Sequence, residues 1–106
     1  KELKRALKLF RAYEHSNFGD DALEKNDTTL AEKEYGIAET MLPNDVELKF
    51  WHAVSLVNKG NVKAALPLFT FAFKADNNWA LLIPRLRKSE LLICDDKTEK
   101  EILGLK

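Results

Sequence analysis

The chain has 106 residues, enough for one domain with a modest core. Its 17 Lys and Arg residues balance its 17 Asp and Glu residues, which argues against a general binder of nucleic acid or acidic membranes, because such binding rests on excess positive charge. The sequence contains no run of about 18 apolar residues, so we expect no membrane insertion.

The N-terminal segment has Leu3, Leu7 and Phe10 at helical spacing. We expect residues 1–11 to extend the first helix backward, with these three side chains facing inward. The chain begins KELKR without an initiator Met. We therefore expect it to be a fragment of a longer protein, whose remaining part would carry any signal sequence and any activity.

When the sequence is aligned with itself after a shift of 34 residues, similar residues coincide along much of the chain. The aligned pairs are Gly19 with Ala53, Asn26 with Gly60, Ala31 with Ala65, Tyr35 with Phe69, and Ala38 with Ala72. Small residues at fixed places in a 34-residue period are typical of tetratricopeptide repeats, which are antiparallel helix pairs. We therefore predict a single all-α domain with a right-handed superhelical twist, with repeats over 12–45 and 46–79 and capping helices over 80–106.

The second repeat is predicted to hold helices over residues 46–58 and 62–75. Polar residues of the latter occupy one narrow strip, so we expect the rest of its surface to be buried. Pro67 lies on this strip and is expected to kink the helix toward solvent. Gly60 should end the first helix with a positive φ, and Asn61 should cap the second.

Further helix starts are predicted from the spacing of capping residues. A fifth helix should begin near residue 79, and a short last helix should cover residues 97–103. The expected caps are Asn44 with Glu47, Asn78, and Asp96 with Glu99.

No pattern in the sequence predicts catalysis, a cofactor or a metal site. His15, His52 and Cys94 lie far apart in the sequence, and the pair Asp95-Asp96 supplies too few oxygen ligands for a hard cation. We expect Cys94 to be a half-buried apolar residue and Asp95-Asp96 to cap a helix.

A narrower resemblance covers nearly the whole chain. The residues that carry it are Phe50, Trp51, Ala53, Leu56, Gly60, Ala65–Phe69, Ala72, Phe73, Asn78, Trp79, Leu82, Pro84–Leu86, Leu91, Leu92, Asp95 and Asp96. They resemble the C-terminal domain of a bacterial family whose N-terminal domain is similar to Ntn hydrolases. That C-terminal domain is named for peptidoglycan binding, so the resemblance implies a non-catalytic accessory domain with peptidoglycan as its ligand. Its compartment, cytoplasm or cell envelope, would depend on the part of the protein that precedes this chain. The sequence departs from the family at Ile93-Cys94, where the family tends to have a Pro.

In tetratricopeptide proteins the first helix of each pair lines a concave groove, and the resemblance carries this face onto the chain. The predicted groove residues are Tyr13, Asn17, Asp20, Glu24, Glu47, Phe50, Trp51, Val54 and Asn58, with Arg85 and Lys88 at one end. One subgroup clamps a peptide carboxylate with Lys, Asn and Arg at set groove positions. Ser16 and Asp20 occupy those places here, so we reject that binding mode.

Three roles stay open at this point. The chain is a protein-interaction module for its own upstream domain or a second copy of itself, a glycan binder, or a structural appendage. An exposed apolar patch would favour a protein partner. Exposed rings at Phe50, Trp51 or Trp79 would favour stacking on sugars.

Overall fold

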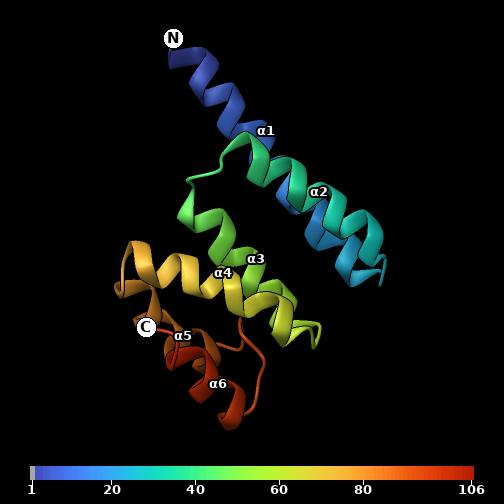
Figure 1. Ribbon diagram of the computed structural model, residues 1–106. Helices are drawn as coiled ribbons and strands as arrows, with labels where there is room; N and C mark the ends of the chain where they lie inside the picture. Colours follow the sequence, from blue (N-terminus) through green and yellow to red (C-terminus); the bar gives the residue numbers. More distant parts are fainter. Residues whose placement is uncertain (1) are drawn as a thin grey trace. The chain divides into compact units, whose positions relative to one another are not determined.

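The computed structural model describes the backbone of residues 2–106 and the side chains of Lys4 and residues 6–106. Over this part of the chain all regular structure is helical, which confirms the predicted all-α fold (Figure 1). The helices are α1 (Glu2–Glu24), α2 (Thr28–Met41), α3 (Val46–Asn58), α4 (Val62–Ala75), α5 (Asn78–Lys88) and α6 (Asp96–Leu103). The chain divides into two compact units, residues 1–48 and 49–106, and each is described by itself.

The first unit is a hairpin of two antiparallel helices, α1 and α2 (Figure 1). As predicted, α1 extends backward from the first repeat without a break, and it has 23 residues against the 14 of α2. The N-terminal turns of α1 therefore project beyond α2. Leu7 and Phe10 are 41% and 67% exposed, so the prediction that they face inward was wrong, because α2 is too short to cover them. Leu3 lies outside the described side chains.

The 34-residue repetition predicted from the sequence is present in the helix boundaries. Adding 34 to the bounds of α2 gives the bounds of α4, and the last residues of α1 and α3 are also 34 apart. The four aligned pairs of small and aromatic residues within these helices are all buried: Gly19 and Ala53, Ala31 and Ala65, Tyr35 and Phe69, and Ala38 and Ala72. The tetratricopeptide resemblance itself stays a prediction.

The turns between paired helices also repeat. Gly60 takes a positive φ of 84° as predicted, and its aligned partner Asn26 has φ 63°. In both turns the following residue donates its N–H back across the helix end, from Asn61 to Leu56 O and from Asp27 to Ala22 O, each at 2.8 Å. These are Schellman-type ends, which favour residues that tolerate the left-handed conformation.

Aspartates cap the starts of α2, α3 and α6, and two of the predicted caps are displaced by one residue. Asp45, and not Asn44, accepts from Leu48 N at 3.1 Å at the start of α3. Asp95, and not Asp96, accepts from Thr98 N at 2.8 Å at the start of α6. Each carboxylate satisfies a free N–H of the first turn and also complements the positive end of the helix dipole.

The other two asparagines predicted as caps, Asn61 and Asn78, make no side-chain capping hydrogen bond. Asn61 occupies the N-cap position of α4 but its side chain makes no capping hydrogen bond. Asn78 is the first residue of α5, where its N–H is bound by Asp76 Oδ1 at 2.9 Å.

The core of the second unit is built around Phe50 of α3. Its ring centroid lies 4.8 Å from Trp79, 5.4 Å from Trp51 and 5.8 Å from Phe69. The prediction that α4 is buried on most sides was wrong. Its buried residues form one face, whereas Phe71 is 37% exposed and lies under the ammonium of Lys49 at 5.0 Å.

Candidate functional site

Two residues of the predicted groove lie in the core. Phe50 and Val54 are only 0% and 4% exposed, which corrects their assignment to a binding surface. The ring of Phe50 is enclosed by other aromatic rings of its own unit, so no ligand can reach it. Trp51 is half-buried, as is Trp79.

Two further groove candidates hold the first unit together. The hydroxyl of Tyr13 donates to the Asp45 carboxylate, 3.2 Å from Oδ2. Burial, followed by the nearby charges of Asp45 and Glu47, raises the pKa of Tyr13 to about 12. Asp20 accepts a short hydrogen bond from the hydroxyl of Tyr35 on α2. Both side chains therefore make hydrogen bonds within the first unit.

Asn58, at the end of α3, forms hydrogen bonds to the loop that follows α5. Its side-chain amide donates to Leu91 O at 3.0 Å, and its oxygen accepts from Ile93 N at 2.7 Å. This two-point contact fixes the segment that joins α5 to α6. The sequence indicated this contact only through an Asn at the end of a predicted helix. An Asn in that position has many possible partners.

The other groove candidates are exposed. Asn17, Glu24 and Glu47 lie at the surface of the first unit, and Arg85 and Lys88 lie at the surface of the second. Because the five residues belong to two separately described units, the groove as a whole stays a prediction.

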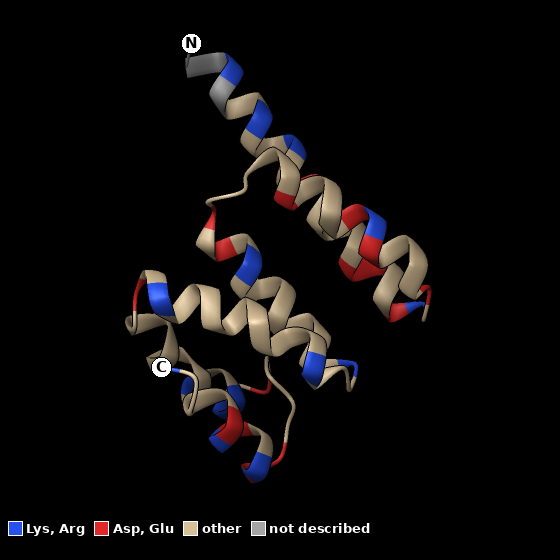
Figure 2. Cartoon of the chain, in the orientation of Figure 1, with Lys and Arg blue, Asp and Glu red and all other residues tan. Residues whose placement is uncertain are grey.

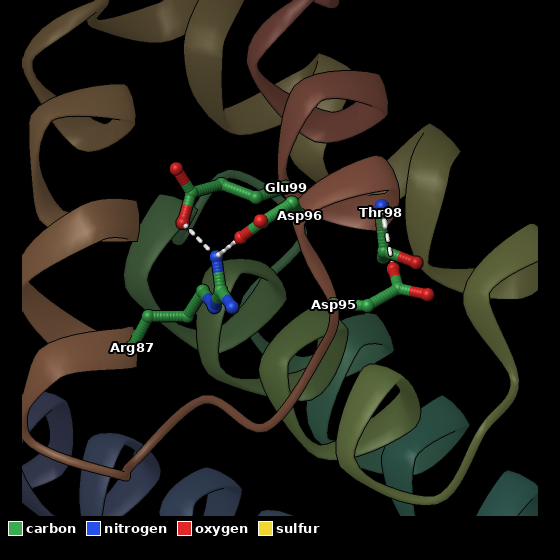
Figure 3. A network of polar contacts seen from close by, with 5 residues as sticks. All are labelled: Arg87, Asp95, Asp96, Thr98 and Glu99. Carbon is green, nitrogen blue, oxygen red and sulfur yellow. Dashed lines mark hydrogen bonds and ion pairs between the residues drawn. The ribbon is translucent and has the colours of Figure 1, made fainter.

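A polar network closes the C-terminal end of the second unit (Figure 3). Nη1 of Arg87 in α5 donates to Asp96 Oδ1 at 2.8 Å and to Glu99 Oε1 at 2.9 Å in α6. These hydrogen bonds, first that to Glu99 and then that to Asp96, raise the pKa of the guanidinium. Beside them, hydrogen bonds from the side chain and backbone of Thr98 lower the pKa of Asp95. The network joins two helices, and Arg87 is engaged by both carboxylates.

Cys94 has the half-buried position expected of it. It borders a depression that Arg87, Glu90, Leu92 and Ile93 also line. Burial raises the pKa of its thiol, so the neutral form dominates near neutral pH and the sulfur is a poor nucleophile.

Two kinds of feature are absent from the described residues. No group of three or more His, Cys, Asp or Glu side chains there is arranged to hold a metal ion. No described helix is both long and apolar enough to cross a membrane.

The surface that stands out is the exposed side of α1. Leu7, Phe10 and Phe18 are 41%, 67% and 48% exposed, so three large apolar side chains lie at the surface of one helix. Leu7 and Arg11 border two shallow depressions in this surface. One is shared with Lys4, Lys8 and Met41, and the other with Ala6, Phe10 and Glu14.

Charge is strongly separated along the same hairpin. Residues 1–11 contain five basic residues and one acidic residue, whereas residues 12–48 contain two basic and ten acidic residues. Figure 2 shows basic positions along the projecting end of α1 and acidic positions toward the other end of the hairpin. The zero net charge of the chain hides this separation, which is why composition alone did not reveal it.

Phe18 is held at the surface by a neighbour on α1 that is itself anchored to α2. The ring of Phe18 meets that of His15 edge to face, with centroids 6.2 Å apart. Nδ1 of His15 lies 2.6 Å from Glu34 Oε2 on α2. Glu34 therefore orients His15, and His15 supports the exposed ring of Phe18.

Comparison of the chain with models of known protein families, with curated proteins and with solved structures gives no match in any of the three.

Proposed function

We propose that this chain is a non-catalytic protein-interaction module whose binding surface is the exposed side of α1. The observation that carries the proposal is the exposure of Leu7, Phe10 and Phe18 on one helix. Apolar side chains that gather at a surface are typical of protein-binding sites. Aromatic residues such as Phe10 and Phe18 also supply much of the energy at protein interfaces.

The charges around these side chains support specificity. The projecting turns of α1 are basic and the rest of the hairpin is acidic. Such a separation orients an approaching partner and disfavours partners with the wrong charge pattern. The 34-residue helix pairs support the same role, because tetratricopeptide repeats, which they resemble, mostly bind proteins. In the family that the sequence resembles, the partner would include the upstream domain of the same protein.

Photocrosslinking tests this proposal. A photoreactive phenylalanine analogue replaces Phe10 in the full chain, and a matched control carries it at Leu81 of α5, which is similarly exposed at 60%. We expect adducts with polypeptide, identified by mass spectrometry, from position 10 and not from position 81. An absence of polypeptide adducts from position 10, or equal yields from both positions, would overturn the proposal.

Peptidoglycan binding, which the family resemblance implies, is the second candidate. It is supported by the partly exposed rings of Trp51 and Trp79, since aromatic faces stack on sugars. Co-sedimentation of the purified chain with insoluble sacculi tests it, with Trp51→Ala as the comparison. Retention that Trp51→Ala abolishes would favour the glycan ligand. Equal retention of the native chain and the Trp51→Ala variant would count against a site at Trp51.

A further inference from the structure

The exposed side of α1 carries a stripe of charged and apolar side chains at regular spacing. Its residues are spaced by three and four in alternation, which places them on one side of a helix over about 26 Å. The stripe residues are Lys4, Leu7, Arg11, Glu14, Phe18 and Asp21, and all six side chains are exposed. From the N-terminal end the stripe reads basic, apolar, basic, then acidic, apolar, acidic.

This order makes the stripe complementary to itself when it is reversed. In an antiparallel pair of α1 helices centred between Ala12 and Tyr13, Lys4 lies opposite Asp21, Leu7 opposite Phe18, and Arg11 opposite Glu14. Two-fold symmetry then repeats each contact, which gives four pairs of opposite charge and two apolar pairs. A parallel pair would instead set each charge against its own copy, and like charges in contact are unfavourable.

The surface around Leu7 has room for the apolar contact. Leu7 borders both shallow depressions of α1, one on the side of Met41 and one on the side of Phe10. The ring of Phe18, supported by His15, stands out from the helix and is the side chain that antiparallel pairing brings to Leu7.

The stripe is also separate from the face of α1 that packs on α2. Ala12 clusters with Ala38, and Gly19 lies against Tyr35, so these two α1 positions mark the packed face. On a helix of 3.6 residues per turn that face lies about a third of a turn from the stripe. A second helix can therefore pack on the stripe while the hairpin stays intact.

We propose that two copies of this chain associate through their α1 stripes, side by side and antiparallel. The inference rests on the proposed function and names the partner as a second copy of the chain. Two hairpins joined in this way form a four-helix arrangement whose seam has two ionic contacts at its centre, one apolar contact on each side of them and one ionic contact at each end. Phe10, which borders the stripe, adds apolar surface to the seam.

Sedimentation of the full chain across the micromolar range tests the association. We expect a monomer–dimer equilibrium at low salt that weakens near 1 M NaCl, where the Debye length is about 3 Å. Arg11→Glu or Glu14→Arg alone replaces two attractive pairs by two repulsive ones, so each should weaken the dimer roughly tenfold or more. The double variant Arg11→Glu/Glu14→Arg restores opposite charges across an antiparallel seam and should recover dimerisation.

A second charge exchange serves as the matched control. Lys97→Glu/Glu101→Lys exchanges two exposed charges on α6, also within one helix, and should leave the dimer unchanged. Circular dichroism of every variant reports whether the helices still form. Failure of the Arg11/Glu14 double variant to recover, with helices intact, would overturn the antiparallel pairing.

Cysteine crosslinking tests the register directly. In a Cys94→Ser background, a mixture of Leu7→Cys and Phe18→Cys chains should form a mixed disulfide dimer, and Leu7→Cys alone should not crosslink. Crosslinking of Leu7→Cys with itself in preference to the mixture would overturn the register.

A chain that stays monomeric across the micromolar range at low salt overturns the second copy as partner. If position 10 still photocrosslinks to a different polypeptide, the protein-interaction function stands. If no polypeptide is crosslinked either, both proposals are overturned.

Discussion

A Cβ atom placed on Gly19 of α1 would lie only 2.8 Å from Cε1 of Tyr35 on α2. The ring of Tyr35 is 2% exposed and its hydroxyl donates to Asp20, so it cannot easily move away. We expect Gly19→Ala to lower the free energy of unfolding by about 1–2 kcal/mol, because overpacking costs more than the gain of about 1 kcal/mol in helix propensity. Urea denaturation followed by circular dichroism measures the change.

Gly36 provides the control for this substitution within the same hairpin. It lies in the middle of α2, and a Cβ atom there would meet nothing within 4 Å. Gly36→Ala should therefore raise the free energy of unfolding by about 0.5–1 kcal/mol. Similar effects of the two substitutions would contradict the close approach of α1 and α2 at Gly19.

The side chain of Asn58 should contribute to stability through its two hydrogen bonds to the loop after α5. Asn58→Ala removes both, and we expect a loss of about 1–2 kcal/mol, since each exposed or half-exposed hydrogen bond contributes about 0.5–1.5 kcal/mol. Amide hydrogen exchange offers a local measurement, because the N–H of Ile93 loses its acceptor and should exchange faster.

Asn61 is the matched residue for this comparison. It lies at the start of α4, where its side chain makes no capping hydrogen bond. Asn61→Ala should change the unfolding free energy by less than about 0.5 kcal/mol, as is usual for surface positions without such contacts. If Asn58→Ala were as mild, and Ile93 stayed protected, the loop would not depend on Asn58.

The sequence predicted what depends on local pattern and on repetition. Gly60 ended its helix as expected, because a positive φ is a property of the residue and its place after an apolar run. The pairs Tyr35 with Phe69 and Ala31 with Ala65 were found by their spacing, and all four residues are buried. Capping was harder, since Asn44 has a Glu three residues later and Asp45 does not, yet the carboxylate of Asp45 accepts the bond from Leu48 N.

Burial that depends on distant partners could not be predicted in this way. Phe50 is enclosed partly by Trp79, which comes from another helix of its unit. The exposure of Phe10 depends on the residue at which α2 ends. The spacing of apolar residues in the segment 1–11 gives no information about that residue. The stripe on α1 does not follow from the sequence pattern, because the helical spacing of Leu7 with Leu3 and Phe10 is also typical of a face turned to the core.

The two carboxylates that bind Arg87 should differ in importance. The side chain of Glu99 is 23% exposed, whereas that of Asp96 is 90% exposed. An exposed ion pair is screened by water and contributes little. We expect Glu99→Gln to lower the urea midpoint clearly and Asp96→Asn to leave it nearly unchanged. At high salt both decreases in the urea midpoint should be smaller, with that of Glu99→Gln still the larger. A larger decrease for Asp96→Asn would contradict this expectation.

The phenol of Tyr13 should make stability depend on pH in the alkaline range. Its pKa rises from 10.0 to about 12 in the folded chain, chiefly through burial and then through Asp45 and Glu47. Below pH 10 the phenol is protonated in both states. Between pH 10 and 12 the unfolded chain releases this proton and the folded chain keeps it, so the free energy of unfolding falls as the pH rises.

Other groups also titrate in this range, and the variant Tyr13→Phe separates their effect from that of the Tyr13 phenol. This variant should lose part of the decrease in stability with pH that the native chain shows in the alkaline range. Asp45→Asn removes one of the charges and should shift the titration of the phenol, followed by its ultraviolet absorbance, toward lower pH. Equal slopes for the native chain and Tyr13→Phe would show that the contact between Tyr13 and Asp45 does not control this proton.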